Sequence, residues 1–297
     1  MSAPIDRALV LAAGLGTRLR PLTTIRAKPA IPVGGEPLVR RITAWLAHSG
    51  VRDVVVNLHH LPETITCVLG DGSDLNARVR YSWEQPLILG SAGGPRRALD
   101  IIGAESFFIV NGDTLTDLDL AALAARHQAS GARVTLALTP NTRPDHYGGV
   151  LLDGDEVRGF VPKGARAAGS FHFVGVQAAS ASVFRDLSPA EPASTVGAVY
   201  DRMIDASPSS IRGFVCDARF FDIGTVADYV AACHSLAPAG ASTIAWDNVE
   251  IDEAANLQDC IVTDGVRVPA GARYAHAILM RDGAGGILAL PWANDRD

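Results

Sequence analysis

The chain has 297 residues, of which 48% are hydrophobic and 20% charged, and its formal net charge is −6. The length allows a sizeable core, and the composition is typical of globular rather than disordered proteins. The acidic balance argues against a nucleic-acid partner, which requires a basic surface. No apolar run reaches the roughly 20 residues of a membrane span, the N-terminus has no signal-peptide pattern, and the four cysteines are widely separated. We therefore expect a cytoplasmic protein with no membrane partner.

The N-terminal half alternates between apolar strand patterns and helical patterns. The run at 8–13 predicts a strand buried on both faces, and it leads into a turn rich in glycine and arginine. This alternation implies right-handed crossovers and an α/β fold with a Rossmann-like, mixed but mainly parallel sheet and helices on both faces. Further strands are predicted at 53–58, 79–83, 107–111 and 134–138, and helices at 37–48, 61–69, 93–102 and 118–129.

After residue 139 the pattern changes. Short strands bounded by glycine and aspartate are predicted, and helices resume only later. We interpret this half as mixed strands that form the wall of an acceptor pocket. The predicted strands are 149–152, 157–161 and 171–178, and the predicted helices are 182–187 and 196–206.

The C-terminal part has its own periodicity. Residues 237–242 have the composition of a linker, so we predict a main domain over 1–236 and a second segment over 243–297. Apolar or small residues then recur at sixfold spacing, which is typical of a β-helix. We predict a short, left-handed β-helix-like cap, and an irregular tail with chance spacing is the alternative. The two rows are Val249, Ala255 and Ile261, and Ile251 and Leu257.

The most distinctive local feature is L-A-A-G-L-G-T-R-L-R-P-L-T, residues 11–23, followed by Lys28-Pro29. Gly14 and Gly16 let backbone N–H groups approach a ligand closely. A dinucleotide fingerprint needs a glycine where Leu19 stands, and no Gly-Lys-Ser/Thr of a Walker loop follows. Arg18 and Lys28 supply cations behind the turn, which suits a triphosphate. The alternative is a tight turn with solvated basic residues.

Two aspartates are the candidate metal ligands. Asp113 follows the predicted strand 107–111, and Asp222 stands in F-F-D-I-G-T before a glycine turn and a helix. Two carboxylates suffice to hold Mg²⁺ when phosphate and water complete its octahedron. Each could instead be a helix cap. Asp117 and Asp119 are interpreted as capping or surface acids.

These motifs resemble those of the sugar nucleotidyltransferases over about residues 8–236. G-x-G-T-R-L-x-P-L-T followed by K-P is similar to the family signature, and N-G-D-T and F-D-I-G-T-x-x-D-Y resemble its metal-binding segments. The resemblance implies a Mg²⁺-dependent enzyme that joins a nucleoside triphosphate to a sugar 1-phosphate and releases pyrophosphate. It assigns catalytic roles to Arg18, Lys28, Asp113 and Asp222, the last two as metal ligands.

Substrate-binding residues follow from the same resemblance. L-G-S-A-G-G at 89–94 is similar to the segment beside the nucleobase, and Y-G-G-V at 147–150 and F-V-G-V at 173–176 are similar to sugar-site elements. Relatives commonly have E-K-P where this chain has V-P-K-G at 161–164, so a glutamate that often contacts the sugar hydroxyls is missing. The nucleotide-binding set is Leu11, Ala12, Ala13, Gly14, Gly16, Thr17, Gln85, Gly90, Ser91 and Gly93, and the sugar-phosphate-binding set is Gly149, Lys163 and Gly175.

The members most similar in these features are mannose-1-phosphate guanylyltransferases, so a hexose-1-phosphate guanylyltransferase using GTP is the first hypothesis. A uridylyltransferase using UTP and a hexosamine or N-acetylmuramic acid 1-phosphate is the alternative. A glycosyltransferase would not need Arg18 and Lys28, and a non-catalytic nucleotide-sugar-binding subunit would not need to keep the key polar residues. Family analogy and the edge of a β-helix also suggest a homo-oligomer.

Overall fold

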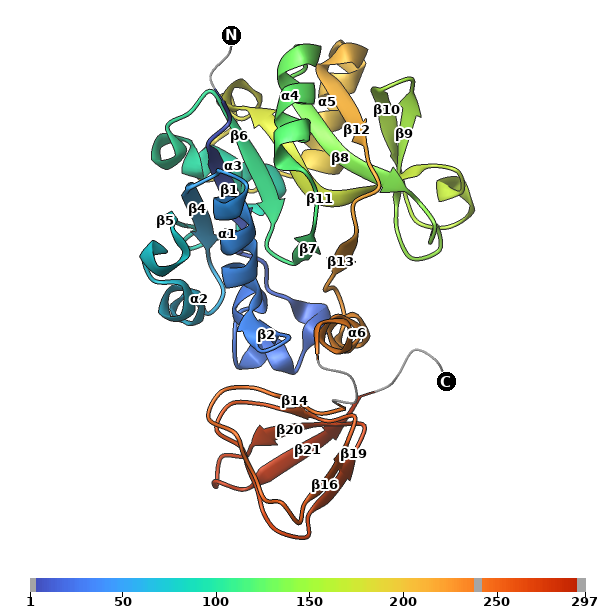
Figure 1. The fold of residues 1–297 in the computed structure, drawn as a ribbon. Coiled ribbons are helices and arrows are strands. Elements are labelled where there is room, and N and C mark those ends of the chain that lie inside the picture. The colour runs from blue at the N-terminus through green and yellow to red at the C-terminus, as the bar shows by residue number, and fades with distance from the viewer. Residues whose placement is uncertain (1–3, 238–241, 293–297) are drawn as a thin grey trace. The chain divides into compact units, whose positions relative to one another are not determined.

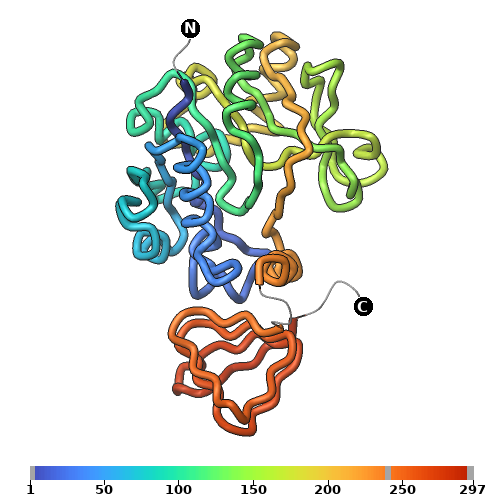
Figure 2. The backbone as a smooth tube through the Cα atoms, in the orientation of Figure 1, coloured from blue at the N-terminus to red at the C-terminus, as the bar shows by residue number. Residues whose placement is uncertain are grey.

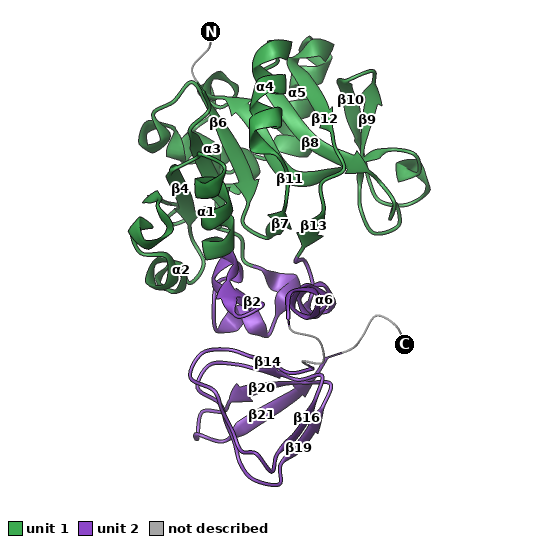
Figure 3. Ribbon diagram, viewed as in Figure 1, with its two compact units in different colours: residues 1–15, 39–222 green, residues 16–38, 223–297 purple. Residues whose placement is uncertain are grey.

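The computed structural model describes residues 4–237 and 242–292. It divides into two compact units, residues 1–15 with 39–222 and residues 16–38 with 223–297, which Figure 3 shows in green and purple. Residues 238–241 of the predicted linker lie outside the described residues. The second unit thus combines residues 16–38, which follow the first strand, with the C-terminal part of the chain from residue 223. The predicted domain boundary near 236–243 therefore stays a prediction.

A nine-stranded sheet forms the first unit, in the order β5-β4-β1-β6-β11-β8-β12-β10-β9. Neighbours from β5 to β6 are parallel, as are β8 and β12, whereas β11 and β10 run antiparallel to their neighbours. The sheet is therefore mixed but mainly parallel, as predicted. Its strands are β1 (Arg7–Leu11), β4 (Asp53–Leu58), β5 (Arg78–Trp83), β6 (Ser106–Asn111), β8 (Val134–Pro140), β9 (Gly149–Asp153), β10 (Glu156–Val161), β11 (Phe171–Ser180) and β12 (Ile211–Val215).

Helices cover both faces of this sheet, because apolar residues of its central strands point to either side and must be buried on both. Leu9, Val55 and Ile109 lie in one buried cluster with residues of α3 and α5. The alternate residues Val54 and Val110 are also buried, and α1 and α4 lie on the near side of the sheet in Figure 1. The helices are α1 (Leu38–His48), α2 (Pro62–Leu69), α3 (Gly90–Ile102), α4 (Leu120–Ser130) and α5 (Tyr200–Ala206).

Three features differ from the sequence-based expectations. The predicted helix at 182–187 is wrong, since only a 3₁₀ turn at Ala181–Val183 forms there. The predicted helix at 196–206 begins late, because Val196 is extended and Gly197 has a φ of +81°, so regular α5 starts at Tyr200. Finally, β12 and a small antiparallel pair, β7 (Thr114–Thr116) with β13 (Phe220–Asp222), were not predicted.

The second unit begins with three successive 3₁₀ turns, Thr17–Leu19, Leu22–Thr24 and Lys28–Ala30. A short hairpin of β2 (Pro32–Val33) and β3 (Glu36–Pro37) follows. Helix α6 (Val226–Leu236) belongs to the same unit, and its N-terminus carries a capping box of Thr225 and Asp228. These turns carry the Arg18 and Lys28 side chains.

The C-terminal segment is a β-helix-like stack, which confirms the predicted cap. Figure 2 shows its superposed triangular turns in red and orange. Ile244 pairs in parallel with Ile261, and Ile261 with Ile278, so one coil takes seventeen residues. The strands are β14 (Ile244–Ala245), β15 (Glu250–Ile251), β16 (Asn256–Gln258), β17 (Ile261–Val262), β18 (Arg267–Val268), β19 (Arg273–Ala275), β20 (Ala277–Arg281) and the antiparallel β21 (Ile287–Pro291).

The sixfold rows largely point into this stack. Val249, Ala255 and Leu257 pack against its buried core, and Ile261 is fully buried. Ile251 is the exception, since it is 40% exposed. The spacing therefore identified the architecture from four of its five residues.

Candidate active site

Two segments of the predicted site leave the sheet side by side in the first unit. Strands β1 and β6 are parallel neighbours, with Leu11 opposite Asn111. The N–H of Gly112 donates to the Leu11 carbonyl at 2.9 Å, which continues the pairing by one residue. The turn of residues 12–14 and the carboxylate of Asp113 therefore start from the same edge, where open α/β sheets bind ligands. A Cβ on Gly14 would meet no atom within 4 Å, so this turn borders open space.

The β7–β13 pair brings the second aspartate to this edge. In its antiparallel register Asp222 lies opposite Thr114, which is the residue after Asp113. At the other end of the pair Arg219 donates to Asp117, with Nε and Oδ2 2.7 Å apart. Asp119 caps α4 by accepting from two backbone N–H groups. Asp117 and Asp119 thus have the surface and capping roles that were predicted for them.

Asp113 and Asp222 are the residues that could hold a metal ion at this edge of the sheet. Across residues 4–237 and 242–292, no three histidine, cysteine, aspartate or glutamate side chains gather into a metal-binding group. A pair of carboxylates at the sheet edge leaves most of the coordination sphere to water and phosphate, which is how Mg²⁺ is commonly held.

Gly175 lies against the segment that carries Asp113. It has a φ of +82°, and a Cβ there would stand 2.6 Å from the Thr114 hydroxyl and 3.0 Å from the Asn111 amide nitrogen. Only glycine lets β11 pass so close to the chain on either side of Asp113. The predicted sugar-side glycine is therefore next to the predicted metal ligand.

A buried polar network connects the glycine turn to the predicted base segment. The backbone N–H of Ala12 donates to the Asn57 side-chain oxygen at 2.5 Å, and the Asn57 amide nitrogen donates to Glu84 at 2.6 Å. The other Glu84 oxygen accepts from the Leu89 N–H at 2.7 Å. Burial raises the pKa of Glu84, although these donors act in the opposite direction. Sequence analysis missed this network, and its one visible signal was a polar Asn57 inside an apolar strand.

The start of α3 is packed against residues 191–195. The N–H groups of Ala92 and Gly93 donate to the Ala193 carbonyl at 2.9 and 3.2 Å. A Cβ on Gly90 would stand 2.8 Å from that carbonyl oxygen, and Ser91 hydrogen-bonds Thr195 through its hydroxyl. The small residues of this turn are therefore required by chain packing. Gln85, six residues before Ser91, is exposed and directly follows the buried Glu84.

The predicted sugar side contains an apolar cavity of about 200 Å³ within the first unit. Gly149 lines it, and a Cβ there would overlap the Ser170 hydroxyl. Lys163 is exposed two residues beyond β10 and is not among the lining residues. The other lining residues are Leu136, Gly148, Val150, Phe160, Val161, His172, Phe173, Thr195, Val196 and Tyr200.

An aromatic stack runs from this cavity to the strand that carries Asp222. The ring of His172 lies 4.0 Å from Tyr147 and 4.8 Å from Phe220, measured between centroids. Burial lowers the pKa of His172 to about 4, with a smaller contribution from His146, so its imidazole is neutral near pH 7. Phe220 is in β13, two residues before Asp222. The stack therefore joins the sugar-side strands to the strand of the second aspartate.

The cationic residues belong to the second unit. Gly16 has a φ of +60°, and a Cβ on it would stand 2.7 Å from a Thr23 methyl and 3.3 Å from Lys28 Cβ. The guanidinium of Arg18 lies against Gly224, where a Cβ would come within 3.1 Å of Nη1. Both Arg18 and Thr17 are exposed. The second unit thus places Arg18 beside the glycine of the F-D-I-G-T motif, which the sequence did not indicate.

Known proteins are similar to this chain in sequence and in fold. The sequence profile of a family described as nucleotidyl transferase matches residues 7–238. A mannose-1-phosphate guanylyltransferase of Mycobacterium tuberculosis is 28% identical over 293 residues, covering 89% of this chain and 81% of the relative. A D-glycero-α-D-manno-heptose 1-phosphate guanylyltransferase of Aneurinibacillus thermoaerophilus is 31% identical over 229 residues, which cover 77% of this chain and 97% of the relative. The crystal structure of HddC from Yersinia pseudotuberculosis complexed with GMP-PN superposes with a TM-score of 0.66 at 26% identity. The match covers 78% of this chain and 99% of that structure's chain.

Within residues 4–237 and 242–292, none of the helices is both long and apolar enough to cross a membrane.

Proposed function

The chain belongs to the nucleotidyl transferase family, and on that premise we propose that it is a sugar-1-phosphate guanylyltransferase. The observation that carries the proposal is the pairing of Asp222 with Thr114, which brings the second aspartate to the sheet edge where Asp113 and the turn after β1 emerge. An oxygen of the sugar phosphate would attack the α-phosphorus of GTP. The bond from that phosphorus to the β-phosphate oxygen would break, and pyrophosphate would leave.

The carboxylates of Asp113 and Asp222 would hold Mg²⁺, which when bound would neutralise phosphate charge. Backbone N–H groups of Ala13 and Gly14 would approach the phosphates, because Gly14 borders open space. Arg18 and Lys28 would bind the triphosphate and stabilise the departing pyrophosphate. No general base is needed, since the attacking sugar phosphate is already an anion. Rate acceleration would come from positioning and charge neutralisation.

On the acceptor side, the cavity beside Gly149 would take the sugar ring. Its wall of Leu136, Val150 and Phe160 suits the apolar face of a pyranose, and the neutral His172 adds a hydrogen-bonding edge. Lys163 would bind the sugar phosphate. Because it is exposed and outside the cavity lining, it would have to approach the acceptor when the substrate binds.

The choice of GTP follows the names of the two relatives, which use mannose 1-phosphate and a heptose 1-phosphate. A pyrophosphate-release assay with Mg²⁺ should cross GTP, UTP, ATP and dTTP with hexose, hexosamine, N-acetylmuramic acid and heptose 1-phosphates. Turnover with GTP and a hexose or heptose 1-phosphate supports the proposal. Turnover with UTP and an amino sugar replaces it with the uridylyltransferase, and binding of a nucleotide sugar without turnover replaces it with a sensor subunit.

The metal assignment has a sharper test. Asp113→Ala should lower kcat about 1,000-fold or more, because it removes a ligand that acts on the charge of the transferred group. Asp117→Asn is the matched control, since Asp117 is in the same segment but pairs with Arg219. It should retain nearly full activity. Full activity of folded Asp113→Ala would contradict the assignment.

A further inference from the structure

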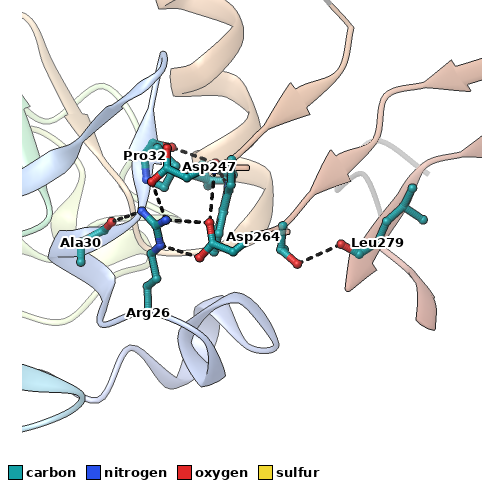
Figure 4. Close-up of polar contacts among 9 residues, drawn as sticks. Arg26, Ala30, Pro32, Asp247, Asp264 and Leu279 are labelled. Atoms are coloured by element: carbon teal, nitrogen blue, oxygen red, sulfur yellow. Dashed lines mark hydrogen bonds and ion pairs between the residues drawn. The ribbon is translucent and has the colours of Figure 1, made fainter. Parts of the chain in front are cut away.

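Arg26 belongs to the second unit and lies between the 3₁₀ turn Leu22–Thr24 and the 3₁₀ turn that begins at Lys28. Its side chain is only 11% exposed, and its guanidinium reaches two aspartates of the C-terminal stack. Nε donates to one Asp264 oxygen at 2.7 Å, and Nη2 donates to the other at 2.6 Å. Nη2 also donates to Asp247 at 2.6 Å, and Nη1 points at the Ala30 carbonyl at 3.4 Å (Figure 4). All three guanidinium nitrogens therefore have partners.

The two carboxylates come from equivalent corners of successive coils. Asp247 follows β14 by two residues and Asp264 follows β17 by two residues, and these strands pair in parallel. The Asp247 N–H also donates to Asp264 at 3.2 Å, which holds the two corners together. One coil further along, the same corner carries Arg281. The acidic pair is thus confined to the two coils that face Arg26.

A second anchor holds the chain on the other side of Lys28. The Arg26 guanidinium lies 5.5 Å from the centre of the Trp246 ring. The Trp246 indole N–H donates to the Tyr229 hydroxyl at 2.9 Å, and that hydroxyl donates to the Pro32 carbonyl at 2.9 Å. Trp246 and Tyr229 are buried. Lys28 therefore stands between an anchor at Arg26 and an anchor at Pro32.

We propose that Arg26 is a positioning residue, and that the first two coils of the C-terminal stack act through it to hold residues 17–30 in the conformation that binds the triphosphate. This inference rests on the proposed function for the role of Arg18 and Lys28, but not for the contacts. An ion pair whose guanidinium is largely buried is a poor source of net stability, because desolvation of the cation offsets the attraction. What the planar, bidentate guanidinium supplies is a defined geometry, which lysine cannot reproduce.

The test compares Arg26→Met, Arg26→Lys and Asp264→Asn with Arg267→Met in the full chain. Arg267 is a matched control, because it makes an ion pair with Glu250 on the same stack but its side chain is 78% exposed. Hydrogen exchange of the peptides covering residues 17–30 should accelerate at least about tenfold in both Arg26 variants, and less in Asp264→Asn, which keeps Asp247. Exchange in Arg267→Met should equal wild type.

Kinetics provide the second readout. Arg26→Met and Arg26→Lys should raise the triphosphate KM about tenfold and leave the sugar-phosphate KM within about twofold, a split that a general loss of stability would not produce. Unchanged exchange at 17–30, or an equal rise throughout the chain, would overturn the proposal. If Arg26→Met fails to fold, Asp264→Asn carries the same comparison. Faster exchange at 17–30 in a protein without guanylyltransferase activity would support the anchoring and reject the proposed function instead.

Discussion

Two regions of the predicted nucleotide site are held by different kinds of polar contact. In the first unit, the buried carboxylate of Glu84 accepts from neutral donors, the Asn57 amide and the Leu89 N–H. In the second, Arg26 forms charged contacts with Asp264 and the largely exposed Asp247. Removal of Glu84 leaves both of its donors without an acceptor. Removal of one of the two aspartates leaves Arg26 with the other. We therefore expect one substitution to destabilise the first region strongly and the second region only in part.

The largest effect should come from Glu84→Ala. It leaves the Asn57 amide and the Leu89 N–H buried without their acceptor, and each such loss costs about 1–3 kcal/mol. We expect the free energy of unfolding to fall by about 3 kcal/mol in urea titrations. Glu105→Ala is the control, since it breaks an exposed ion pair with Arg185 and should change stability by under about 1 kcal/mol. Equal losses in both variants would show that the buried hydrogen bonds of Glu84 contribute no more to stability than an exposed ion pair.

Gly94→Ala should have the next largest effect, because it crowds the same network. A Cβ at Gly94 would stand 2.6 Å from Glu84 Oε1 and 2.8 Å from the Asn57 amide nitrogen. Overpacking of this kind costs about 1–3 kcal/mol, and the better helix propensity of alanine returns at most about 1 kcal/mol. Thermal unfolding should show a lower Tm. Gly283→Ala is the control, because its Cβ would have open space around it and its stability should not change. An increase in the Tm of Gly94→Ala would show that Glu84 and Asn57 can move aside at little cost.

The pH dependence should separate the regions further. Burial raises the pKa of Glu84 in the folded chain above its unfolded value of about 4.3. Its favourable contribution is then fully present below the unfolded pKa and is lost as the pH rises through the folded pKa. The difference in free energy of unfolding between wild type and Glu84→Gln should therefore decrease as the pH rises from 4 to 8. A difference that stays constant or increases would mean that the pKa of Glu84 is not raised.

The smallest effect should come from Asp247→Asn. Asp247 is 63% exposed, and Arg26 keeps both bonds to Asp264 in its absence. A loss of about 0.5–1 kcal/mol is expected at low salt, and 1 M NaCl should reduce it because exposed charges are screened. Chemical unfolding at both salt concentrations measures this. A loss as large as that of Glu84→Ala would show that one substitution destabilises the charged region as much as the buried one.

Local patterns predicted most of the parallel half of the sheet. The apolar runs of β1 and β4 mark fully buried strands, and Asp113 could be placed at a strand end from sequence alone. The insertion of β11 between β6 and β8 could not be predicted, because strand order depends on pairing between residues about 65 positions apart, such as Val176 with Val110. For the same reason the pairing that places Asp222 beside Thr114 was not visible.

The supporting contacts of the site were the least predictable. Arg26 finds its partners 221 and 238 positions along the chain. Nothing in its local sequence distinguishes it from the solvated arginines around it. Gln85 was assigned to the nucleotide site by resemblance, but nothing in the sequence indicated that the neighbouring Glu84 carboxylate accepts hydrogen bonds from Asn57 and Leu89. Motifs mark the residues that meet a ligand more readily than those that hold them.

The C-terminal stack ends where β21 turns back antiparallel on β20, pairing Arg281 with Ile287 and Ala277 with Pro291. A parallel solenoid can otherwise be lengthened one repeat at a time, since each coil contacts only its neighbours. The reversal sets the number of repeats, and it lies on the coil beyond Asp247 and Asp264. Repeats could therefore be gained or lost near the hairpin during evolution while the two coils that hold Arg26 stay unchanged.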